Sequence, residues 1–456
     1  IQDINISSTG DAIDVGSSSA NITLEGDNKL FSETGSGLHV SDGNVTITGS
    51  GSLEAGNGDE NIYSDDAKIG SHENEDMSGS IRITGDATVT AKRDSGYGDG
   101  AGIGSGNGGN MSGSITIDGN ANVDSFSNYD GAGIGSGDGG EMSGDITIGG
   151  NAQVTAVSEC DGAGIGAGWR SDMSGNITIG DNARVTAWGD SSGAGIGSGY
   201  KGNVSGTITI GGNAQVTAGS NSETAGIGSR NNGSITSAGR IIIRDSAKVT
   251  AIGEDEGAGI GTGEDELMAG MIIIQDNAQV TAIAGDRAAA IGSDNRNEMT
   301  GTIFIIGNAR VTTGILDNDA VDFDYNTKEI KYTLDENSIG YIGDSQSSNH
   351  KSDNGHYVIG PDVTINGING SDTEALKDYI NMRLSGENHD GEPENLTRLD
   401  IRSENGEFTV TAEGEGAVEK ILYGCNETVP TAPGTYPVTC VVRLGEETVE
   451  FRIGTL

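Results

Sequence analysis

Short apolar stretches return along the middle of the chain with an almost constant period. The phrase Gly-Ala-Gly-Ile-Gly, or a close variant of it, occurs seven times. Five of the six steps between its isoleucines are 31 residues long and one is 33 residues long. The isoleucines are Ile103, Ile134, Ile165, Ile196, Ile227, Ile260 and Ile291. A period this regular is typical of one supersecondary unit stacked on copies of itself.

Each repeat contains three stretches of strand length, as in residues 115–117, 121–123 and 132–134. The first stretch alternates between apolar and polar positions, which favours a strand with one buried face. Gly, Asn and Asp residues cluster between the stretches and indicate turns. Three strands and three turns in ~31 residues predict one coil of a right-handed parallel β-helix, an all-β solenoid.

Stacking such coils places equivalent residues in columns along the solenoid. An inward valine column, an alanine column and a methionine column are expected to form the core, with methionine filling irregular gaps rather than binding metal. Asparagine precedes each alanine and is expected to form a hydrogen-bonded ladder at a turn. The methionine column is Met77, Met111, Met142, Met173, Val204, Met268 and Met299, and the polar ladder is Asp86, Asn120, Asn151, Asn182, Asn213, Ser246, Asn277 and Asn308.

The period changes toward both ends of the chain. Residues 1–66 follow a period of 23 residues and predict narrower coils, whereas 67–312 form the regular coils and 313–370 hold an insertion and the last coil. Ile13, Leu38, Ile69, the seven repeat isoleucines and Ile342 indicate eleven coils in all. The insertion reads as a β-hairpin that turns near residues 326–328. Both ends of the chain look cut, which suggests a piece of a longer protein.

Two further segments follow the predicted solenoid. Residues 371–385 predict a short helix that begins on a capping box of Ser371 and Glu374 and caps the open end of the stack. Residues 386–456 contain alternating strands between Gly and Pro turns and predict a small Ig-like β-sandwich. Cys425 and Cys440 lie in this region and are expected to form a disulfide, while Cys160 is expected to be unpaired.

Composition and charge narrow the function. The chain has 456 residues, of which 78 are Gly and 33% are apolar, and only the repeat explains how so few apolar residues form a core. The net charge is −43, which excludes nucleic acid as a partner and disfavours anionic lipid. No apolar run of about 18 residues occurs, so no membrane insertion is expected for this chain.

The first candidate site is a column of acidic residues just before the repeated phrase. Asp99, Asp130 and Asp161 occupy equivalent positions in three successive coils. Carboxylates one coil apart repel by ~0.9 kcal/mol in water, and a hard cation such as Ca²⁺ would relieve that repulsion. The alternative is a solvated acidic stripe. Apart from this Ca²⁺, no cofactor is expected.

The second candidate lies in the insertion and the loop after it, where His and carboxylates are close together in sequence. The residues are Asp317, Asp319, Asp322, Asp324, His350, Asp353 and His356. Two carboxylates can hydrolyse a glycosidic bond, one as acid and one as base or nucleophile. Acidic residues are abundant throughout, so we expect no catalytic residues. If the chain is an enzyme, Asp317, Asp322, Asp324 and His356 are the candidates.

The third candidate is a group of aromatic residues on equivalent turns. Trp169 and Tyr200 each follow their repeat isoleucine by four residues, and Tyr129, Phe126 and Trp188 lie before the phrase. Aromatic faces stack on sugar rings, so Trp169, Tyr200, Trp188 and Tyr129 are the expected ligand-binding residues. The alternative is a set of incidental surface aromatics.

The repeat SGxITIxGNAxVTAxxxxxGAGIGSG resembles the Gly-rich repeats of cell-surface proteins in anaerobic Gram-positive gut bacteria. The stretches DAIDVGSSSANITLEGDNKLF and GLHVSDGNVTITGSGSLEA resemble a segment labelled carbohydrate-binding in such proteins. The resemblance covers about residues 1–312 and implies a β-helix on an exported, often wall-attached protein; the C-terminal strands resemble the Ig-like modules that follow such stacks.

These observations lead to one function and two alternatives. The first is a non-catalytic extracellular surface module, an adhesin or stalk on the cell surface or wall. Its expected partners are host or dietary glycans or another surface protein. The alternatives are a β-helix glycosidase that uses acids of residues 317–356, and a purely structural spacer.

Overall fold

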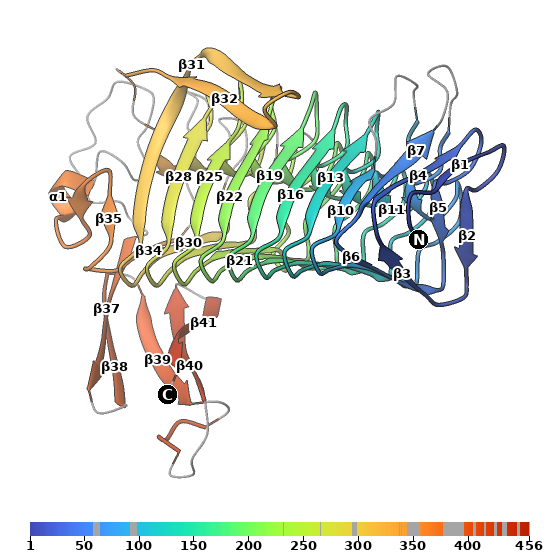
Figure 1. The fold of residues 1–456 in the computed structure, drawn as a ribbon. Helices are drawn as coiled ribbons and strands as arrows, with labels where there is room; N and C mark the ends of the chain where they lie inside the picture. The colour runs from blue at the N-terminus through green and yellow to red at the C-terminus, as the bar shows by residue number, and fades with distance from the viewer. Residues whose placement is uncertain are drawn as a thin grey trace.

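The structure is a computed structural model of the whole chain. It describes all residues except 58–63, 92–97, 231, 265, 294–298, 337, 339, 344–355, 377–395, 405–406, 415, 424–425, 431–435, 445–446 and 456. Parallel β-coils stack along one axis from the N-terminus to a C-terminal group of antiparallel strands (Figure 1). Three sheets run along this stack, one for each strand of the coil.

The first sheet has 14 strands and contains the valine column, and the alanine column lies directly before its strands. Its strands are β1 (Asn5–Ser8), β4 (Asp27–Ser32), β7 (Ser52–Asn57), β10 (Thr88–Ala91), β13 (Asn122–Ser127), β16 (Gln153–Ser158), β19 (Arg184–Gly189), β22 (Gln215–Ser220), β25 (Lys248–Ile252), β28 (Gln279–Ala284), β31 (Arg310–Asp324), β32 (Glu329–Leu334), β35 (Thr364–Ile365) and β36 (Ile368–Asn369).

The second sheet has 11 short strands built on the repeated Ile-Gly pair. They are β2 (Ile13–Gly16), β5 (Leu38–Val40), β8 (Ile69–Gly70), β11 (Ile103–Gly104), β14 (Ile134–Gly135), β17 (Ile165–Gly166), β20 (Ile196–Gly197), β23 (Ile227–Gly228), β26 (Ile260–Gly261), β29 (Ile291–Gly292) and β33 (Ile342–Gly343). About eight turns, from β8 to β29, are regular.

The third sheet has 13 strands. They are β3 (Ala20–Leu24), β6 (Asn44–Gly49), β9 (Ser80–Ile83), β12 (Ser114–Ile117), β15 (Asp145–Ile148), β18 (Ile177–Ile179), β21 (Thr207–Ile210), β24 (Arg240–Ile243), β27 (Met271–Ile274), β30 (Thr302–Ile305), β34 (His356–Ile359), β37 (Leu396–Glu404) and β38 (Glu407–Gly414).

The predicted columns are confirmed. Each repeat isoleucine pairs in register with the isoleucine of the next coil, and the methionine column is bridged coil to coil, with Ile235 filling its gap. These side chains form one continuous core that is almost fully buried. In the polar ladder, Asn151 Nδ2 donates to Asn120 Oδ1 at 2.9 Å, and Asn182 Nδ2 donates to Asn151 Oδ1 at 3.1 Å. The ladder therefore satisfies amides that the exposed turn would otherwise leave to water.

The insertion forms the predicted hairpin. β31 continues beyond the solenoid and β32 returns antiparallel to it, so that the hairpin lies over the outer face of the first sheet (Figure 1). Asp324 Oδ1 accepts the N–H groups of Asn326 and Thr327 and stabilises the turn. Phe323 and Ile330 of the hairpin are buried against the sheet. The hairpin therefore covers an apolar patch rather than extending freely.

The predicted capping helix is not supported. The described residues of its segment contain a single helical turn, α1 (Thr373–Leu376). Its first turn is capped by Asp372, whose Oδ1 accepts the Ala375 N–H at 3.2 Å, whereas the Ser371 N–H donates to Asn369 Oδ1 at 2.9 Å. The side chain of Glu374 and residues 377–385 lie outside the described residues. Leu376 is 1% exposed and packs on the end of the core.

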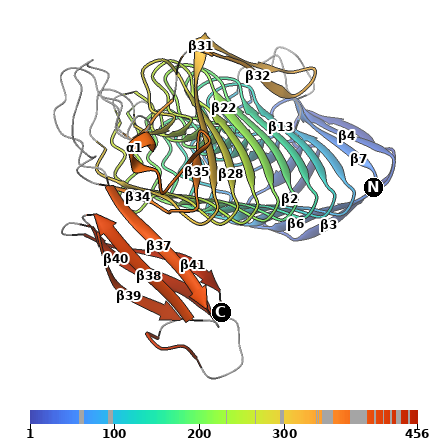
Figure 2. The ribbon, with the colours of Figure 1, turned by 90° about the vertical axis from the view of Figure 1, so that its left-hand side faces the viewer.

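The predicted Ig-like sandwich is also not supported. β37 pairs parallel with β34 and β38 pairs antiparallel with β37, so these strands extend the third sheet. β39 (Ala417–Tyr423), β40 (Pro437–Leu444) and β41 (Glu447–Thr455) form a separate three-stranded antiparallel sheet (Figure 2). Cys440 and Val442 share a buried cluster with Phe304 of the third sheet. Leu399 of β37 and Val410 of β38 belong to the same cluster, so the strands after the solenoid form an extension of the third sheet and one small antiparallel sheet.

The predicted disulfide is not supported: Cys440 is a buried free thiol, and Cys425 lies outside the described residues. Cys160 is a free thiol, as predicted. No helix among the described residues is long and apolar enough to cross a membrane.

Candidate functional site at the acidic column and the aromatic turn

The acidic column lies at the turn that leads into the second sheet. Asp99, Asp130 and Asp161 stand in successive coils, as predicted. Each backbone N–H at this position donates to the carboxylate of the coil before it: the Asp99 N–H donates to Asp65 Oδ1 at 3.2 Å, and the Asp130 and Asp161 N–H groups donate to Asp99 and Asp130. The carboxylates are therefore held in a row by the coil spacing itself.

The aromatic turn packs directly on this row. In four successive coils, the residue four positions after the repeat isoleucine donates its backbone N–H to the carbonyl of an acidic-column residue in the preceding coil. The pairs are Asn107 to Asp65 at 2.8 Å, Asp138 to Asp99 at 3.0 Å, Trp169 to Asp130 at 2.8 Å, and Tyr200 to Asp161 at 3.0 Å. Two candidates that are separate in the sequence thus belong to one face of the solenoid.

Burial and mutual repulsion raise the pKa values of the acids on this face. Burial, reinforced by Asp161 and Asp99, raises the pKa of Asp130 to about 6. Burial, reinforced by Asp99 and Asp130, raises the pKa of Asp138 to about 7. Burial and the neighbouring Asp65 also raise the pKa of Asp99. The charged forms are destabilised here because burial and the neighbouring carboxylates outweigh the nearby Arg170 guanidinium.

The group of donor atoms that best suits a cation differs from the predicted Asp99, Asp130 and Asp161. Donor atoms of Asp130, Cys160 and Asp161 lie within 4.8 Å of one another, whereas Asp99 is not among them. Asp130 is only 6% exposed, and its Oδ1 makes no hydrogen bond within the described part of the chain. Burial and the two carboxylates raise the pKa of the Cys160 thiol to about 12, so the thiol is protonated and donates to Asp130. Two carboxylates therefore provide the hard donors.

Sequence reasoning missed Asp138 and Cys160 in this group. Asp138 follows Ile134 by four residues, as Trp169 follows Ile165. The two residues are therefore equivalent in the aligned repeats, and the sequence alone places Asp138 on the aromatic turn. Cys160 lies next to Asp161 and was considered only as an unpaired thiol. Aligning the turns by coil, rather than by residue type, would have found both residues.

We expect stability to fall as the pH rises through the range in which these acids ionise. Asp138 binds its proton more tightly in the folded chain than in the unfolded chain, where its pKa is near 3.8. The stabilising contribution of protonated Asp138 to the fold is therefore complete below about pH 4 and is lost as the pH rises through about 7. Asp138→Asn should raise the free energy of unfolding at pH 8 by about 2 kcal/mol. This is less than the full pKa shift would give, because the side chain is partly exposed to solvent.

Urea unfolding at pH 5 and pH 8 measures this effect, with Glu141→Gln as the matched control because Glu141 is exposed beyond the same turn. The control should change stability little at either pH. Equal effects of the two substitutions at pH 8 would contradict the pKa assigned to Asp138.

Trp169 and Tyr200 form a stacked pair on adjacent coils. Their ring centroids are 6.5 Å apart and their planes differ by 15°. The Arg170 guanidinium carbon lies 3.6 Å from the Trp169 centroid, and Lys201 Nζ lies 4.8 Å from the Tyr200 centroid. Both rings are half-buried, and the exposed Tyr129 lies before the same phrase in an earlier coil. The pair is therefore a half-buried aromatic surface with cationic side chains over its rings.

Trp188 was wrongly predicted as a ligand-binding residue. It is 1% exposed and stacks on Phe323 of the hairpin with centroids 6.2 Å apart. Phe126 belongs to the same cluster and is 8% exposed. The hairpin covers both side chains, which leaves them no contact with a ligand.

The candidate catalytic residues of the insertion are not all brought together. Asp317 and Asp322 are exposed on β31, and Asp324 accepts hydrogen bonds at the hairpin turn and pairs with Lys331. His356 begins β34 in the third sheet, away from the hairpin on the first sheet (Figure 1). The side chain of Asp319 and the residues His350 and Asp353 lie outside the described residues. Asp322 and Asp324 both act on the Lys331 ammonium, and Lys331 lies opposite Asp322 in the hairpin.

Five segments of the chain match the family model described as a beta helix repeat. They are residues 81–107, 115–138, 146–169, 177–200 and 241–264. The segment 115–138, for example, covers β12, β13 and β14, which is one coil. The chain therefore carries β-helix repeats in a parallel solenoid. No curated protein and no solved structure matches the chain.

Proposed function

We propose that this chain is a non-catalytic extracellular surface module, a stalk or adhesin that contacts glycans through the turn of Trp169 and Tyr200. The observation that carries the proposal is the stacked pair of half-buried rings, 6.5 Å apart, on a solenoid whose coils are otherwise uninterrupted around it. A stack held by columns of identical residues is rigid along its axis, because each coil is paired to both neighbours. Such a rod suits display of a binding turn away from a surface.

The chemistry around the rings suits a sugar that bears a negative charge. Aromatic faces stack on the apolar faces of sugar rings, while the neighbouring guanidinium and ammonium groups can pair with a carboxylate. Arg170, Lys201 and Arg230 all lie within 5 Å of one of the two ring centroids. Arg170 acts on Asp138 and Arg230 Nη1 lies 3.9 Å from Asp161 Oδ1, so these cations lie beside the acidic row.

Ca²⁺ is part of the proposal as an accessory ion. Asp130 and Asp161 would supply its carboxylate oxygens, and Asp99 lies one coil away. The unpartnered, buried Oδ1 of Asp130 supports this assignment. Since the backbones of Asp130 and Trp169 are hydrogen-bonded, an ion at Asp130 would also brace the aromatic turn.

The proposed location and partners rest on the composition and shape of the solenoid. A strongly acidic, Gly-rich rod resembles exported surface proteins, so we place the chain outside the cell, on the surface or attached to the wall. Its partners would be host or dietary glycans or another surface protein. A glycosidase remains the alternative, but no described contact favours it.

We expect Trp169→Ala and Tyr200→Ala each to weaken glycan binding by about 10-fold, because each substitution removes a ring worth about 1 kcal/mol or more in stacking and area. Binding is measured on a glycan array that includes uronic and sialic acid sugars, with and without Ca²⁺. Tyr332→Ala is the matched control, since Tyr332 is 39% exposed on the hairpin. Unchanged binding by both turn variants would contradict the proposed site, and no glycan binding at all would favour a spacer.

A further inference from the structure

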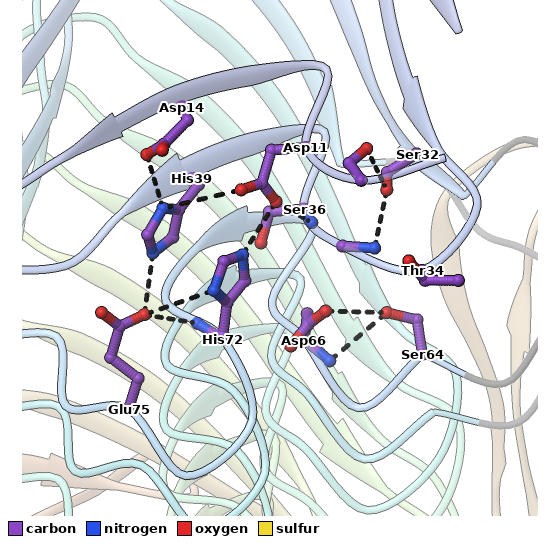
Figure 3. A network of polar contacts seen from close by, with 12 residues as sticks. Asp11, Asp14, Ser32, Thr34, Ser36, His39, Ser64, Asp66, His72 and Glu75 are labelled. Carbon is purple, nitrogen blue, oxygen red and sulfur yellow. Dashed lines mark hydrogen bonds and ion pairs between the residues drawn. The ribbon is translucent and has the colours of Figure 1, made fainter. Parts of the chain in front are cut away.

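Two histidines and three carboxylates from the first three coils gather in one cluster (Figure 3). Asp11 precedes β2 and Asp14 lies within it, His39 lies in β5, and His72 and Glu75 follow β8. The imidazoles of His39 and His72 are stacked, with centroids 3.8 Å apart and planes 6° apart. This cluster joins the narrow coils to the first regular coil and is separate from the insertion.

The contacts divide the cluster into two sides. On one side, His39 Nδ1 lies 2.7 Å from Asp14 Oδ1 and 3.8 Å from Asp11 Oδ2, while His72 Nε2 lies 2.8 Å from Asp11 Oδ1. On the other side, Glu75 Oε2 lies 2.8 Å from His39 Nε2 and 3.6 Å from His72 Nδ1. Asp11 thus stands between one nitrogen of each ring, and Glu75 stands behind both rings.

We propose that the Asp11 side of this cluster is a binding site for a divalent transition metal of the Zn²⁺ class. Its ligands are His39 Nδ1, His72 Nε2 and a carboxylate oxygen of Asp11, with Asp14 as the fourth. The donor atoms of Asp11, His39 and His72 already lie within 4.8 Å of one another. Two imidazoles with carboxylates are donors that Zn²⁺ and its neighbours prefer, whereas Ca²⁺ and Mg²⁺ prefer oxygen alone.

The charge of the cluster favours a divalent cation. Three carboxylates face two imidazoles, so the cluster is negative even if both rings carry an extra proton. His39 is 7% exposed, which keeps solvent from screening that charge. A metal ion on the Asp11 side replaces protons there and leaves the opposite nitrogens as N–H donors to Glu75. Glu75 is then a positioning residue that orients both rings, as carboxylates behind metal-bound histidines commonly do.

The site needs a small rearrangement to close. A tetrahedral Zn²⁺ with bonds of about 2.1 Å holds its ligands about 3.4 Å apart. The hydrogen-bonded pairs His39–Asp14 and His72–Asp11, at 2.7 and 2.8 Å, therefore move apart by about 0.6 Å, and donors that are farther apart, within the 4.8 Å limit, draw together. A metal also lies in the plane of each imidazole that binds it, and the two planes are now parallel. His72 turns to meet this requirement, because its side chain is 35% exposed, whereas the His39 side chain is 8% exposed. The bound ion then links the first three coils to one another.

Equilibrium dialysis of the whole chain against Zn²⁺ in high salt, and the visible spectrum with Co²⁺, test the proposal. We expect wild type to bind one Zn²⁺ more per chain than His72→Gln, and to give the visible bands of four-coordinate Co²⁺ that His72→Gln lacks. Glu75→Gln should keep the stoichiometry but bind about 10- to 100-fold more weakly. His356→Gln is the matched control and should behave as wild type.

Asp11→Asn is the second ligand variant, since the amide oxygen can still accept the Ser36 N–H that Asp11 Oδ1 now accepts at 2.9 Å. It should lose the same equivalent of Zn²⁺ while the chain stays folded by circular dichroism. Equal Zn²⁺ binding and equal Co²⁺ spectra for wild type, His72→Gln and Asp11→Asn would overturn the proposal. So would wild type that gives no four-coordinate Co²⁺ bands.

Discussion

Gly135→Ala should destabilise the solenoid by about 4 kcal/mol, the sum of backbone strain and overpacking. Gly135 has a φ of 144°, and a Cβ atom built on it would lie 1.7 Å from the carbonyl oxygen of Gly166 in the next coil. That oxygen belongs to backbone, and the coils are locked in register on both sides, so neither can move away cheaply. The same contact recurs between Gly104 and Gly135, which explains why each repeat isoleucine is followed by glycine.

Gly139→Ala is the matched control for this change. Gly139 also has a positive φ, of 67°, but no atom lies within 4 Å of the position of its Cβ. We therefore expect a loss of about 1 kcal/mol from backbone strain alone. Urea unfolding followed by circular dichroism and tryptophan fluorescence compares the two variants. Equal losses of stability would contradict the register of the second sheet.

Trp188→Ala should release the hairpin of β31 and β32 from the first sheet, at a loss of about 3–5 kcal/mol in local stability. The Trp188 ring stacks on Phe323 and fills the space over Gly219 of the next coil, within 3.1 Å of where a Cβ of Gly219 would lie. Ile330 closes the same space from the hairpin side. Removing the indole leaves a cavity under the hairpin that the rigid sheet cannot collapse to fill.

Hydrogen exchange of the backbone amides in β32 measures this release. Trp188→Phe should keep most of the protection because it keeps an aromatic ring, and Tyr332→Ala should keep it because Tyr332 is exposed on the same hairpin. The ion pair between Lys328 and Asp124 holds the hairpin tip and should weaken together with the stack. Full protection of β32 in Trp188→Ala would contradict the packing described for the hairpin.

The columns of the core could be predicted from the sequence because one period governs every coil. A residue that recurs every ~31 residues must stack on its own copies. The isoleucine, valine, methionine and asparagine ladders therefore follow from alignment of the repeats alone. The burial of Trp188 was also within reach. Val157, Trp188, Gly219, Ile252 and Ile283 pair in register on the outer face of the first sheet, and an apolar outer column needs a cover.

The histidine cluster could not be found in this way. His39 directly follows its column residue, Leu38, whereas His72 follows Ile69 by three positions, and Asp11 precedes Ile13 by two. The cluster therefore occupies no column, and only the folding of three unequal coils brings it together. The arrangement of the C-terminal strands was wrongly predicted for a related reason. Alternation predicts a strand but does not say whether that strand pairs within a second sheet or at the open edge of the solenoid.

The measurement that tests the proposed function most directly is a glycan array probed with the whole chain, followed by mass spectrometry of the glycans after prolonged contact. The account predicts that wild type retains glycans of unchanged mass, and that a variant with both Trp169→Ala and Tyr200→Ala does not retain them. Shortened glycans, or equal retention by the double variant, would contradict a non-catalytic module that binds through the aromatic turn.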